Sequence, residues 1–441
     1  MKILLIGNGG RENALAWKIY NSKSFKDSNS KLYITLGNPG INKFAEIVEI
    51  SPSDIISLKK FAVAEKIDFT IVGPEAPLSK GIVDEFEKID LKIFGPTKKA
   101  AEIESSKIFA KDLMIRNNIP TAKYRSFSKD VIEEAHKFLG KCSYPVVIKA
   151  DGLASGKGVI IAYDPDESEK TLKDFSEGSS VNEAGFNFLI EEYLEGEEVS
   201  VFAITDGEDY VILPFSQDHK KISEGEKGRN TGGIGAVAPV KKFANVELTE
   251  KIKSKIIEPV LKVMKEEGRP YRGCLYCGLM IVYNEPFVIE FNCRFGDPET
   301  QSVLPLINSD FLEMLIASAT GRMKNYNLKI EDEYTCCVVL ASNGYPDKFE
   351  IGKKITGIDD VGENCLVFHS GTKFERDGKD ILSTGGRVLS VVGVSKKSLE
   401  DAANIAYVNA ERINFENKYF RKDIGFRQMQ AFKNKDREAV G

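Results

Sequence analysis

Residues 288–300 carry the pattern that points most directly to chemistry. Alternation along a strand would place Glu290, Asn292 and Arg294 on one face. A carboxylate and an amide oxygen are hard ligands that Mg²⁺ takes beside the phosphates of ATP. A neighbouring arginine can neutralise charge on a phosphoryl group in transfer. The alternative is a strand whose polar residues face solvent, which the apolar flanking run disfavours.

A glycine-rich turn at 149–159 could fold over a polyphosphate. Lys149 ends a strand-like run and suits a fixed phosphate contact, whereas Lys157 on the loop suits a contact made on closure. The turn is not a Walker A loop, because Gly158 stands where that motif has Ser or Thr. A plain hairpin with solvated lysines is the alternative.

The acidic run 191–200 follows another strand-like run, at 188–190. Such a run is usually a solvated face. Here the carboxylates flank Tyr193 and Leu194, which could pack on an adenine ring while a carboxylate accepts the ribose hydroxyls. The run by itself leaves both interpretations open.

Glycines at 7–10 follow the first strand-like run and would let the backbone approach an anion at a helix start. Glu12 occupies the third glycine position of the dinucleotide fingerprint, and no later acidic residue clearly supports dinucleotide binding. A tight structural turn and a phosphate site are equally open here.

The elements that must position these groups begin with a βαβ pattern, which predicts a parallel sheet. Its short β-branched runs lie at 3–6, 32–36, 69–72 and 91–94. Gly7, Gly37 and Gly73 end three of these runs, where the carboxyl ends of parallel strands place ligand-binding loops. The first part of the chain therefore has a candidate ligand edge.

The pattern changes after residue 105, where a helix-like run is followed by a small separate lobe around the glycine-rich turn. Residues 186–320 carry most of the polar motifs, and the last part of the chain ends in a charged helical tail. The expected elements are a helix at 107–117 and strands at 146–150, 159–162 and 335–341.

Composition sets the limits on class. At 441 residues, about 150 residues per domain predicts roughly three domains. A net charge of −5 gives no indication of a nucleic-acid or membrane surface. The first apolar run is too short for a secretory segment, which favours a cytoplasmic protein. Seven scattered cysteines fit reduced thiols, and Cys274 and Cys277 are expected in a buried strand rather than at a metal.

Together these motifs resemble the ATP-grasp superfamily over nearly the whole chain. Within it, the sequence resembles the phosphoribosylamine–glycine ligase (glycinamide ribonucleotide synthetase) family. The segments that carry the closer resemblance are 7–12, 73–78, 149–158, 216–220, 230–233 and 290–301, with 368–372 and 385–389 near the C-terminus.

The resemblance implies a fold of mixed α/β and α+β multidomain class. It implies an N-terminal parallel βαβ substrate-binding domain at 1–104 and an ATP-grasp domain at 105–325, with a small mobile lid at about 122–190. A C-terminal α+β domain would follow at 326–441. The implied reaction joins glycine to 5-phosphoribosylamine with ATP through glycyl phosphate, in purine synthesis. Mg²⁺ or Mn²⁺ would serve as cofactor, the substrates would be small molecules, and a monomer is expected.

The resemblance also assigns site residues. The ATP-binding residues would be Lys107, Lys149, Lys157, Glu191, Tyr193, Leu194 and Glu198, with Glu198 holding the ribose. The metal would be bound by Glu290 and Asn292. Arg294 would face the acyl phosphate, and Asp218 and Lys220 would lie near glycine. The residues expected to receive phosphoribosylamine are Asn8, Gly9, Gly10 and Glu75.

The chain departs from the family pattern at three places. Asn13 stands where the family typically has histidine, and residues 221–229 lack its usual Arg-rich, Asp-Gly-Asp and Pro-Asn pattern, which leaves the conformation of that loop open. Residues 277–282 contain no second metal-binding carboxylate, so a second Mg²⁺ would depend on nucleotide and water.

Three other functions compete with this one. Another ATP-grasp ligase could share the ATP site and act on a different carboxylate. A nucleotide sensor would have little use for Glu290, Asn292 and Arg294 together. A nicotinamide oxidoreductase would leave everything after residue 105 without a role.

Overall fold

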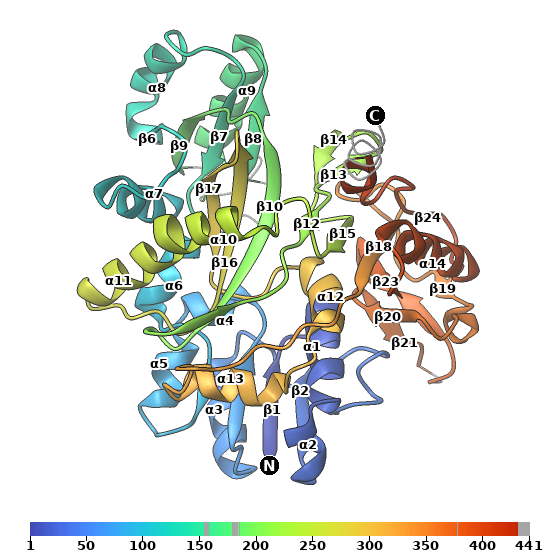
Figure 1. Cartoon of the computed structure of the whole chain (residues 1–441). Coiled ribbons are helices and arrows are strands. Elements are labelled where there is room, and N and C mark those ends of the chain that lie inside the picture. The colour runs from blue at the N-terminus through green and yellow to red at the C-terminus, as the bar shows by residue number, and fades with distance from the viewer. Residues whose placement is uncertain (154–157, 179–183, 185, 377, 431–441) are drawn as a thin grey trace.

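The computed structural model describes residues 1–153, 158–178, 184, 186–376 and 378–430 (Figure 1). The chain has a parallel N-terminal sheet, a small antiparallel lobe, a long antiparallel sheet and a C-terminal sheet. This confirms the expected mixed fold class. Within the described ranges, no helix combines the length and the apolar character needed to span a bilayer.

The N-terminal sheet is wholly parallel, as the sequence pattern predicts, with the strand order β3-β2-β1-β4-β5. The order reverses between β1 and β4, so the loops after these two strands meet at one edge. Gly7 follows β1 with φ at 118°, and at Gly73, after β4, a Cβ atom would collide with Glu12. Both turns therefore need glycine. The strands are Lys2–Ile6 (β1), Lys31–Thr35 (β2), Glu46–Val48 (β3), Phe69–Val72 (β4) and Ile93–Phe94 (β5).

Helix α1 (Gly10–Tyr20) starts directly at this edge. Its first turn is closed by Glu12, whose carboxylate accepts a hydrogen bond from the Gly9 backbone N–H at 2.8 Å. The glutamate that breaks the dinucleotide fingerprint thus occupies the positive end of the helix. The other helices of this part are Lys23–Asp27 (α2), Ile55–Ala64 (α3), Glu75–Ser79 (α4), Ile82–Glu87 (α5), Lys98–Ser105 (α6) and Lys107–Arg116 (α7).

The small lobe is a four-stranded antiparallel sheet of order β6-β9-β7-β8 with two helices against it. Its buried side chains, including Phe127, Ile148, Phe175 and Phe188, form a hydrophobic cluster of their own. Residues 154–157, including Lys157, lie outside the described residues. The elements are Tyr124–Ser128 (β6), Ile132–Leu139 (α8), Val146–Ala150 (β7), Val159–Ala162 (β8), Pro165–Ser176 (α9) and Asn187–Glu192 (β9).

The long antiparallel sheet has the order β11-β10-β16-β17. Cys274 and Cys277 lie on β16, buried and free, so the prediction of a buried strand is confirmed. The sheet carries two helices with a π-helical turn between them. The elements are Glu197–Thr205 (β10), Tyr210–Ile212 (β11), Val246–Ile252 (α10), Glu258–Glu266 (α11), Gly273–Val282 (β16) and Glu285–Asn292 (β17).

The C-terminal sheet recruits strands from the middle of the chain. Its order is β12-β15-β18-β23-β20, with β24 also paired to β18. The strands are Gln217–Asp218 (β12), Gly235–Ala238 (β15), Tyr334–Ser342 (β18), Cys365–His369 (β20), Arg387–Ser395 (β23) and Lys418–Tyr419 (β24).

Shorter strands and three helices complete this part. The hairpin β13–β14 (Lys221–Ser223 and Lys227–Asn230) follows β12. Of the expected charged helical tail, residues 426–430 are helical, and residues 431–441 lie outside the described residues. The remaining elements are Lys354–Ile355 (β19), Thr372–Phe374 (β21), Ile381–Ser383 (β22), Glu299–Val303 (α12), Phe311–Ala319 (α13) and Leu399–Arg412 (α14).

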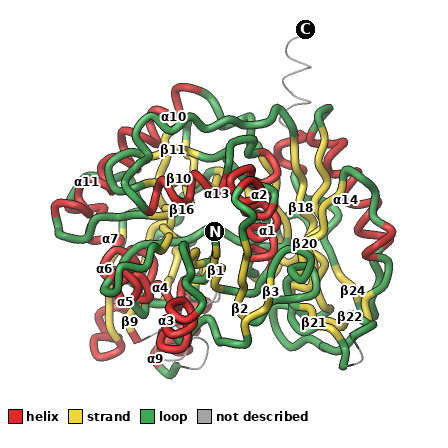
Figure 2. The backbone as a smooth tube through the Cα atoms, turned by 90° about the horizontal axis from the view of Figure 1, so that it is seen from below, coloured by secondary structure: helices red, strands yellow, loops and turns green. Residues whose placement is uncertain are grey.

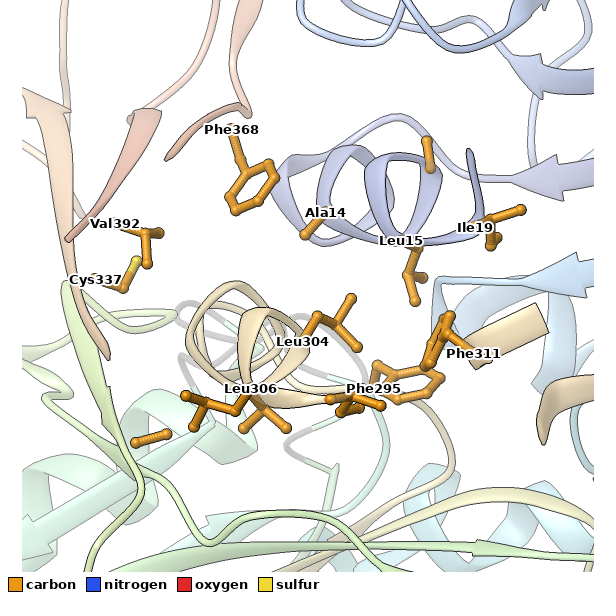
Figure 3. Packing of buried hydrophobic residues seen from close by; sticks show 14 of the residues in the cluster. Ala14, Leu15, Ile19, Phe295, Leu304, Leu306, Phe311, Cys337, Phe368 and Val392 are labelled. Carbon is orange, nitrogen blue, oxygen red and sulfur yellow. The ribbon is translucent and has the colours of Figure 1, made fainter. Parts of the chain in front are cut away.

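One hydrophobic cluster joins the N-terminal and C-terminal sheets. Figure 3 shows Leu15 of α1 pointing toward Leu304 and Phe311, with Phe368 and Val392 of the C-terminal sheet at the other end of the cluster. Figure 2 shows β1 between the sheet that contains β10 and β16 and the sheet that contains β18 and β20. These parts therefore share a core, whereas the small lobe has a separate one.

Truncating Leu304, which has no exposed surface, should lower the free energy of unfolding. Loss of the buried side chain and the cavity left behind cost about 2–5 kcal/mol for Leu→Ala. Urea denaturation of Leu304→Ala measures this loss. The control is Val408→Ala at an exposed position of α14, which should change stability by no more than about 0.5 kcal/mol. Equal effects of the two variants would contradict a shared core at Leu304.

Candidate active site

A cleft of about 680 Å³ lies where the lobe, strand β17, the N-terminal edge and the C-terminal sheet meet. It adjoins a smaller cavity of about 120 Å³ beneath the glycine-rich turn. The larger volume falls within the usual range for small-molecule sites, about 300–1,000 Å³. The predicted residues that line one or both spaces are Glu75, Lys107, Lys149, Glu191, Tyr193, Leu194, Glu198, Asp218, Lys220, Glu290, Asn292 and Arg294.

Asn8, Gly9 and Gly10 are not among the residues that line the two spaces. Gly9 lies beside the cleft, because a Cβ atom on it would be 4.0 Å from Asp297, which does line it. Arg11, which belongs to the 7–12 segment, also lines the cleft, although no role was predicted for it.

Glu191 holds a pair of lysines at the cleft wall. Its Oε2 atom lies 3.0 Å from the Nζ atoms of both Lys111 and Lys149, and all three side chains are buried. Lys149 Nζ also donates to the Ile289 carbonyl at 2.8 Å. Burial lowers the pKa of Lys111 to about 8, against the opposing effect of Glu191. Glu191 Oε1 is buried and has no hydrogen-bond partner among the described residues.

Lys107 holds the base of the glycine-rich turn. Its Nζ donates to the carbonyls of Ala150 and Gly152, each at 2.9 Å. The Asp151 carboxylate accepts the Ile108 backbone N–H at 3.1 Å and so closes the first turn of α7. The start of this turn is thereby tied to the N-terminus of α7.

One end of the cleft is apolar. Tyr193 and Leu194 follow β9, and Leu194 is half-buried. The apolar residues that line this end are Ala122, Val147, Ile161, Leu194 and Met280. A flat apolar ring system would be accommodated there.

Lys220 lies between two carboxylates. Its Nζ is paired with Glu198 and lies 3.1 Å from Glu290 Oε1. The charge of Lys220 lowers the pKa of Glu290 to about 2, although burial opposes this. Glu290 is therefore ionised at any working pH. Asn292 lies two positions further along β17, and among the described residues its Oδ1 accepts one long hydrogen bond, from Arg294 at 3.4 Å.

Asp218 and Glu299 form an acidic pocket that the sequence predicted only in part. Asp218 Oδ1 is buried without a hydrogen-bond partner among the described residues. Burial, followed by the charge of Glu299, raises the pKa of Asp218 well above its usual value. Glu299 accepts from Ser200 Oγ at 3.1 Å, and that hydroxyl is 2.9 Å from Tyr276 OH. The position of Glu299 in the 288–300 motif was its only signal in the sequence.

Arg294 joins the N-terminal edge to the cleft. Its guanidinium lies 3.2 Å from both Glu75 and Glu104. Burial would raise the pKa of Glu75, but the charges of Arg294 and then Arg11 lower it below its usual value. Glu104, on α6, has no motif that could have selected it.

Arg387 brings the C-terminal sheet into the site. It lies 3.3 Å from Asp297 Oδ1 and donates to the carbonyls of Gly232 and Asp297 at 2.6 and 2.8 Å. The sequence placed 385–389 in a C-terminal signature but assigned no role to this arginine.

The structure shows the contacts or the conformation of two places where the sequence departs from the family pattern, Asn13 and residues 221–229. Asn13 Oδ1 accepts the His369 backbone N–H at 2.7 Å, which links α1 to the C-terminal sheet. Residues 221–230 form the β13–β14 hairpin, so the conformation that the sequence left open is now defined. Among the described residues, no group of three or more His, Cys, Asp or Glu could hold a metal ion.

Models of the phosphoribosylglycinamide synthetase family match three successive stretches of the chain. Residues 1–104 match its N domain, 105–300 its ATP-grasp (A) domain and 335–427 its C domain. The chain is also 47% identical over 424 residues to the phosphoribosylamine–glycine ligase of Caldanaerobacter subterraneus subsp. tengcongensis, covering 96% of this chain and 99% of that protein. It is 43% identical to the ligase of the same name from Pasteurella multocida, covering 98% of this chain and 100% of that protein.

The chain is also similar to solved structures. The crystal structure of phosphoribosylamine–glycine ligase from Thermotoga maritima superposes with a TM-score of 0.81 at 32% identity, covering 96% of this chain and 100% of that chain. A biotin carboxylase from Campylobacter jejuni, solved in complex with β-γ-ATP, has a TM-score of 0.70 at 17% identity, covering 96% and 93% of the two chains. At that identity the second likeness concerns the fold alone.

Stability should depend on pH through His369. Burial lowers the pKa of this buried side chain to about 4, with a smaller effect of Lys43. In the unfolded chain histidine titrates near about 6.5, so the unfolded state binds more protons between these values. The contribution is fully present above about pH 6.5 and is lost as the pH falls toward about 4, by at most about 3 kcal/mol. Urea midpoints from pH 7 to 4.5 should fall more steeply for the parent than for His369→Gln, and parallel slopes would contradict this.

Proposed function

The chain belongs to the phosphoribosylglycinamide synthetase family, and we propose that its cleft joins glycine to 5-phosphoribosylamine through a glycyl phosphate intermediate. The chain is an ATP-dependent ligase of purine biosynthesis, and its products are glycinamide ribonucleotide, ADP and phosphate. One observation carries the proposal. The acidic pocket of Asp218 and Glu299 shares a cleft with Lys149 of the lobe and with Glu290 and Asn292.

The nucleotide fits the lobe side of this cleft. Lys107 and Lys149 would face the phosphates, and the apolar end beside Tyr193 and Leu194 would receive adenine. Glu191 Oε1 is a buried acceptor without a donor, which the exocyclic amino group of adenine would supply. Glu198 would accept the ribose hydroxyls, and Lys157 would contact the phosphates when the lid closes.

A divalent cation, Mg²⁺ or Mn²⁺, would be held by Glu290 and Asn292. The ionised carboxylate and the weakly engaged amide oxygen fit a hard cation. Mg²⁺ commonly takes one or two protein ligands and fills its shell with phosphate oxygens and water, so a site with one carboxylate is sufficient. When bound, the ion would offset negative charge on the β- and γ-phosphates.

Glycine fits the acidic pocket by charge. An ammonium group between Asp218 and Glu299 would satisfy the unpartnered Asp218 Oδ1 and relieve the repulsion between the two carboxylates. The carboxylate of glycine would then point toward Lys220 and Arg294, on the side of the phosphates. A single amine of small size is the ligand that such a pocket selects.

Phosphoribosylamine would enter from the N-terminal edge. Gly9 lies beside the cleft there and Glu75 lines it, and we propose that Asn8 and Gly10, on either side of Gly9 in the chain, also contact this substrate. Arg387 also lines the cleft and offers a guanidinium to the phosphate of this substrate. ATP and phosphoribosylamine would thus approach glycine from opposite sides of the cleft.

The chemistry needs no protein nucleophile. The glycine carboxylate attacks the γ-phosphorus and displaces ADP, and the amine of phosphoribosylamine then attacks the acyl carbon and displaces phosphate. Arg294 and Lys220 would neutralise charge that develops on the transferring group. Catalysis would rest on positioning and on charges that are already in place.

We propose the division into 1–104, 105–325 and 326–441, with a mobile lid at about 122–190. The ranges of the three family matches support it. We also propose a cytoplasmic monomer. The seven free cysteines fit a reducing compartment.

The test is ADP release by the purified protein with Mg-ATP and phosphoribosylamine generated in situ, with and without glycine. Glycine-dependent ADP formation with a ribonucleotide product is expected. Asp218→Asn should raise the KM for glycine by about ten- to a hundredfold, since a hydrogen bond to a charged group is lost. Turnover with another carboxylate and none with glycine would overturn the substrate assignment and keep the ATP chemistry.

Glu290→Gln should abolish most turnover that depends on Mg²⁺ while the protein stays folded. The amide keeps the shape of the side chain but removes the charge that faces the metal and Lys220. Turnover against Mg²⁺ concentration and circular dichroism give the two readouts. The matched control is Glu285→Gln, which is at the start of the same strand and paired with lysines at the surface. An unchanged rate for Glu290→Gln would remove this residue from the metal site.

A further inference from the structure

Residues 217–220 present two faces, as alternation along an extended chain requires. Asp218 and Lys220 line the cleft. Gln217 and His219 are buried, with exposed fractions of 2% and 1%, and bond to residues on the opposite side. The front of this stretch is therefore the site, and its back is held by another part of the chain.

That other part is the segment 419–428, about 200 positions later in the sequence. Gln428 Nε2 donates to Gln217 Oε1 at 3.1 Å, and the Gly425 backbone N–H donates to His219 Nε2 at 2.9 Å. Because Nε2 accepts, the ring carries its proton on Nδ1, which is 2.9 Å from Glu226 Oε1. The orientation of His219 is thus fixed from both ends.

Arg421 anchors the segment. It has no exposed surface and pairs with both oxygens of Asp423, at 2.7 and 2.9 Å. It also donates to Glu226 Oε1 and to the Lys221 carbonyl, each at 2.8 Å. A planar guanidinium in such a fork permits one arrangement of its partners. Lys220 is consequently flanked by two residues, His219 and Lys221, that the segment fixes.

The support is lateral, because β12 is the edge strand of its sheet. Pairing with β15 fixes the backbone on one side, including the bond from the His219 N–H to the Gly235 carbonyl at 2.9 Å. The segment 419–428 holds the back-facing side chains of Gln217 and His219, and Gln217 Nε2 also donates to the Glu198 carbonyl of β10 at 2.9 Å. We expect the position of Asp218 and Lys220 in the cleft to depend on all of these supports.

We propose that the segment 419–428 is a positioning element of the active site. In it, Gln428 and Arg421 hold the back of 217–221, so that the side chains of Asp218 and Lys220 keep the positions in which they contact glycine. The inference rests on the proposed function for the identity of that substrate. It gives a role in the reaction to Gln428 and Arg421, which do not line the cleft, although Arg427 of the same segment does.

The test is Gln428→Met, which keeps the volume of the side chain and removes its bond to Gln217. The KM for glycine should rise about five- to tenfold, as expected for one lost buried hydrogen bond, while the KM for ATP stays within twofold (about the precision of the assay). Tyr419→Phe is the matched control, because it removes a bond from the same segment to the hairpin, at the Ile222 carbonyl, without touching 217–221. Its glycine KM should be unchanged and its melting temperature similar.

A purely structural role would lower the melting temperature of Gln428→Met and leave the ratio of the two KM values unchanged, which would overturn the proposal. If Gln428→Met does not fold, Arg421→Lys replaces it, because lysine keeps the charge but cannot form the paired hydrogen bonds of the guanidinium. Its KM for glycine should also rise relative to its KM for ATP. A parent that shows no glycine-dependent turnover would overturn the proposed function as well. Glycine-dependent turnover in the parent, with unchanged variants, would overturn the positioning role alone.

Discussion

Lys149, Lys220 and Arg294 are each paired with carboxylates in the site, and the arrangement of the rest of the site depends on these pairs. Lys220 is at their centre, since it lies between Glu198 and Glu290. Removing one partner of such a pair would leave an ion that the cleft cannot solvate. The proposed ribose, metal and glycine positions are therefore coupled through one ammonium group, and substrates enter a field that is already arranged.

The fold makes these pairs possible by bringing four sheets to one place. Glu191 and Lys149 come from the lobe, Glu75 from the edge of the N-terminal sheet, Glu290 from β17 of the long sheet, and Arg387 from the C-terminal sheet. The last three sheets share cores with their neighbours, whereas the lobe has its own hydrophobic cluster. This division would allow the lobe to move as a unit while the acidic pocket, on the other side of the cleft, keeps its shape.

Sequence reasoning predicted what is local and missed what is not. The strands at 69–72 and 146–150 were predicted at their observed bounds, because β-branched runs with glycine-rich ends carry their own signal. Lys111, Glu104 and Arg387 were missed, since each gains its role from a partner far along the chain. The hairpin at 221–230 was left open for the same reason. Its conformation depends on Arg421, 195 positions beyond Glu226.

The packing around Glu290 is consistent with a single carboxylate in the proposed metal site. On β16 the residue opposite Glu290 is Gly278, and a Cβ atom there would come within 3.0 Å of the glutamate side chain. A second carboxylate at that position would crowd Glu290 and place a like charge beside it. The neighbouring strand therefore provides room for one ionised ligand, and the negative oxygens of a nucleotide can supply the rest of the shell. The charge that a second protein carboxylate would bring is then brought by the substrate itself.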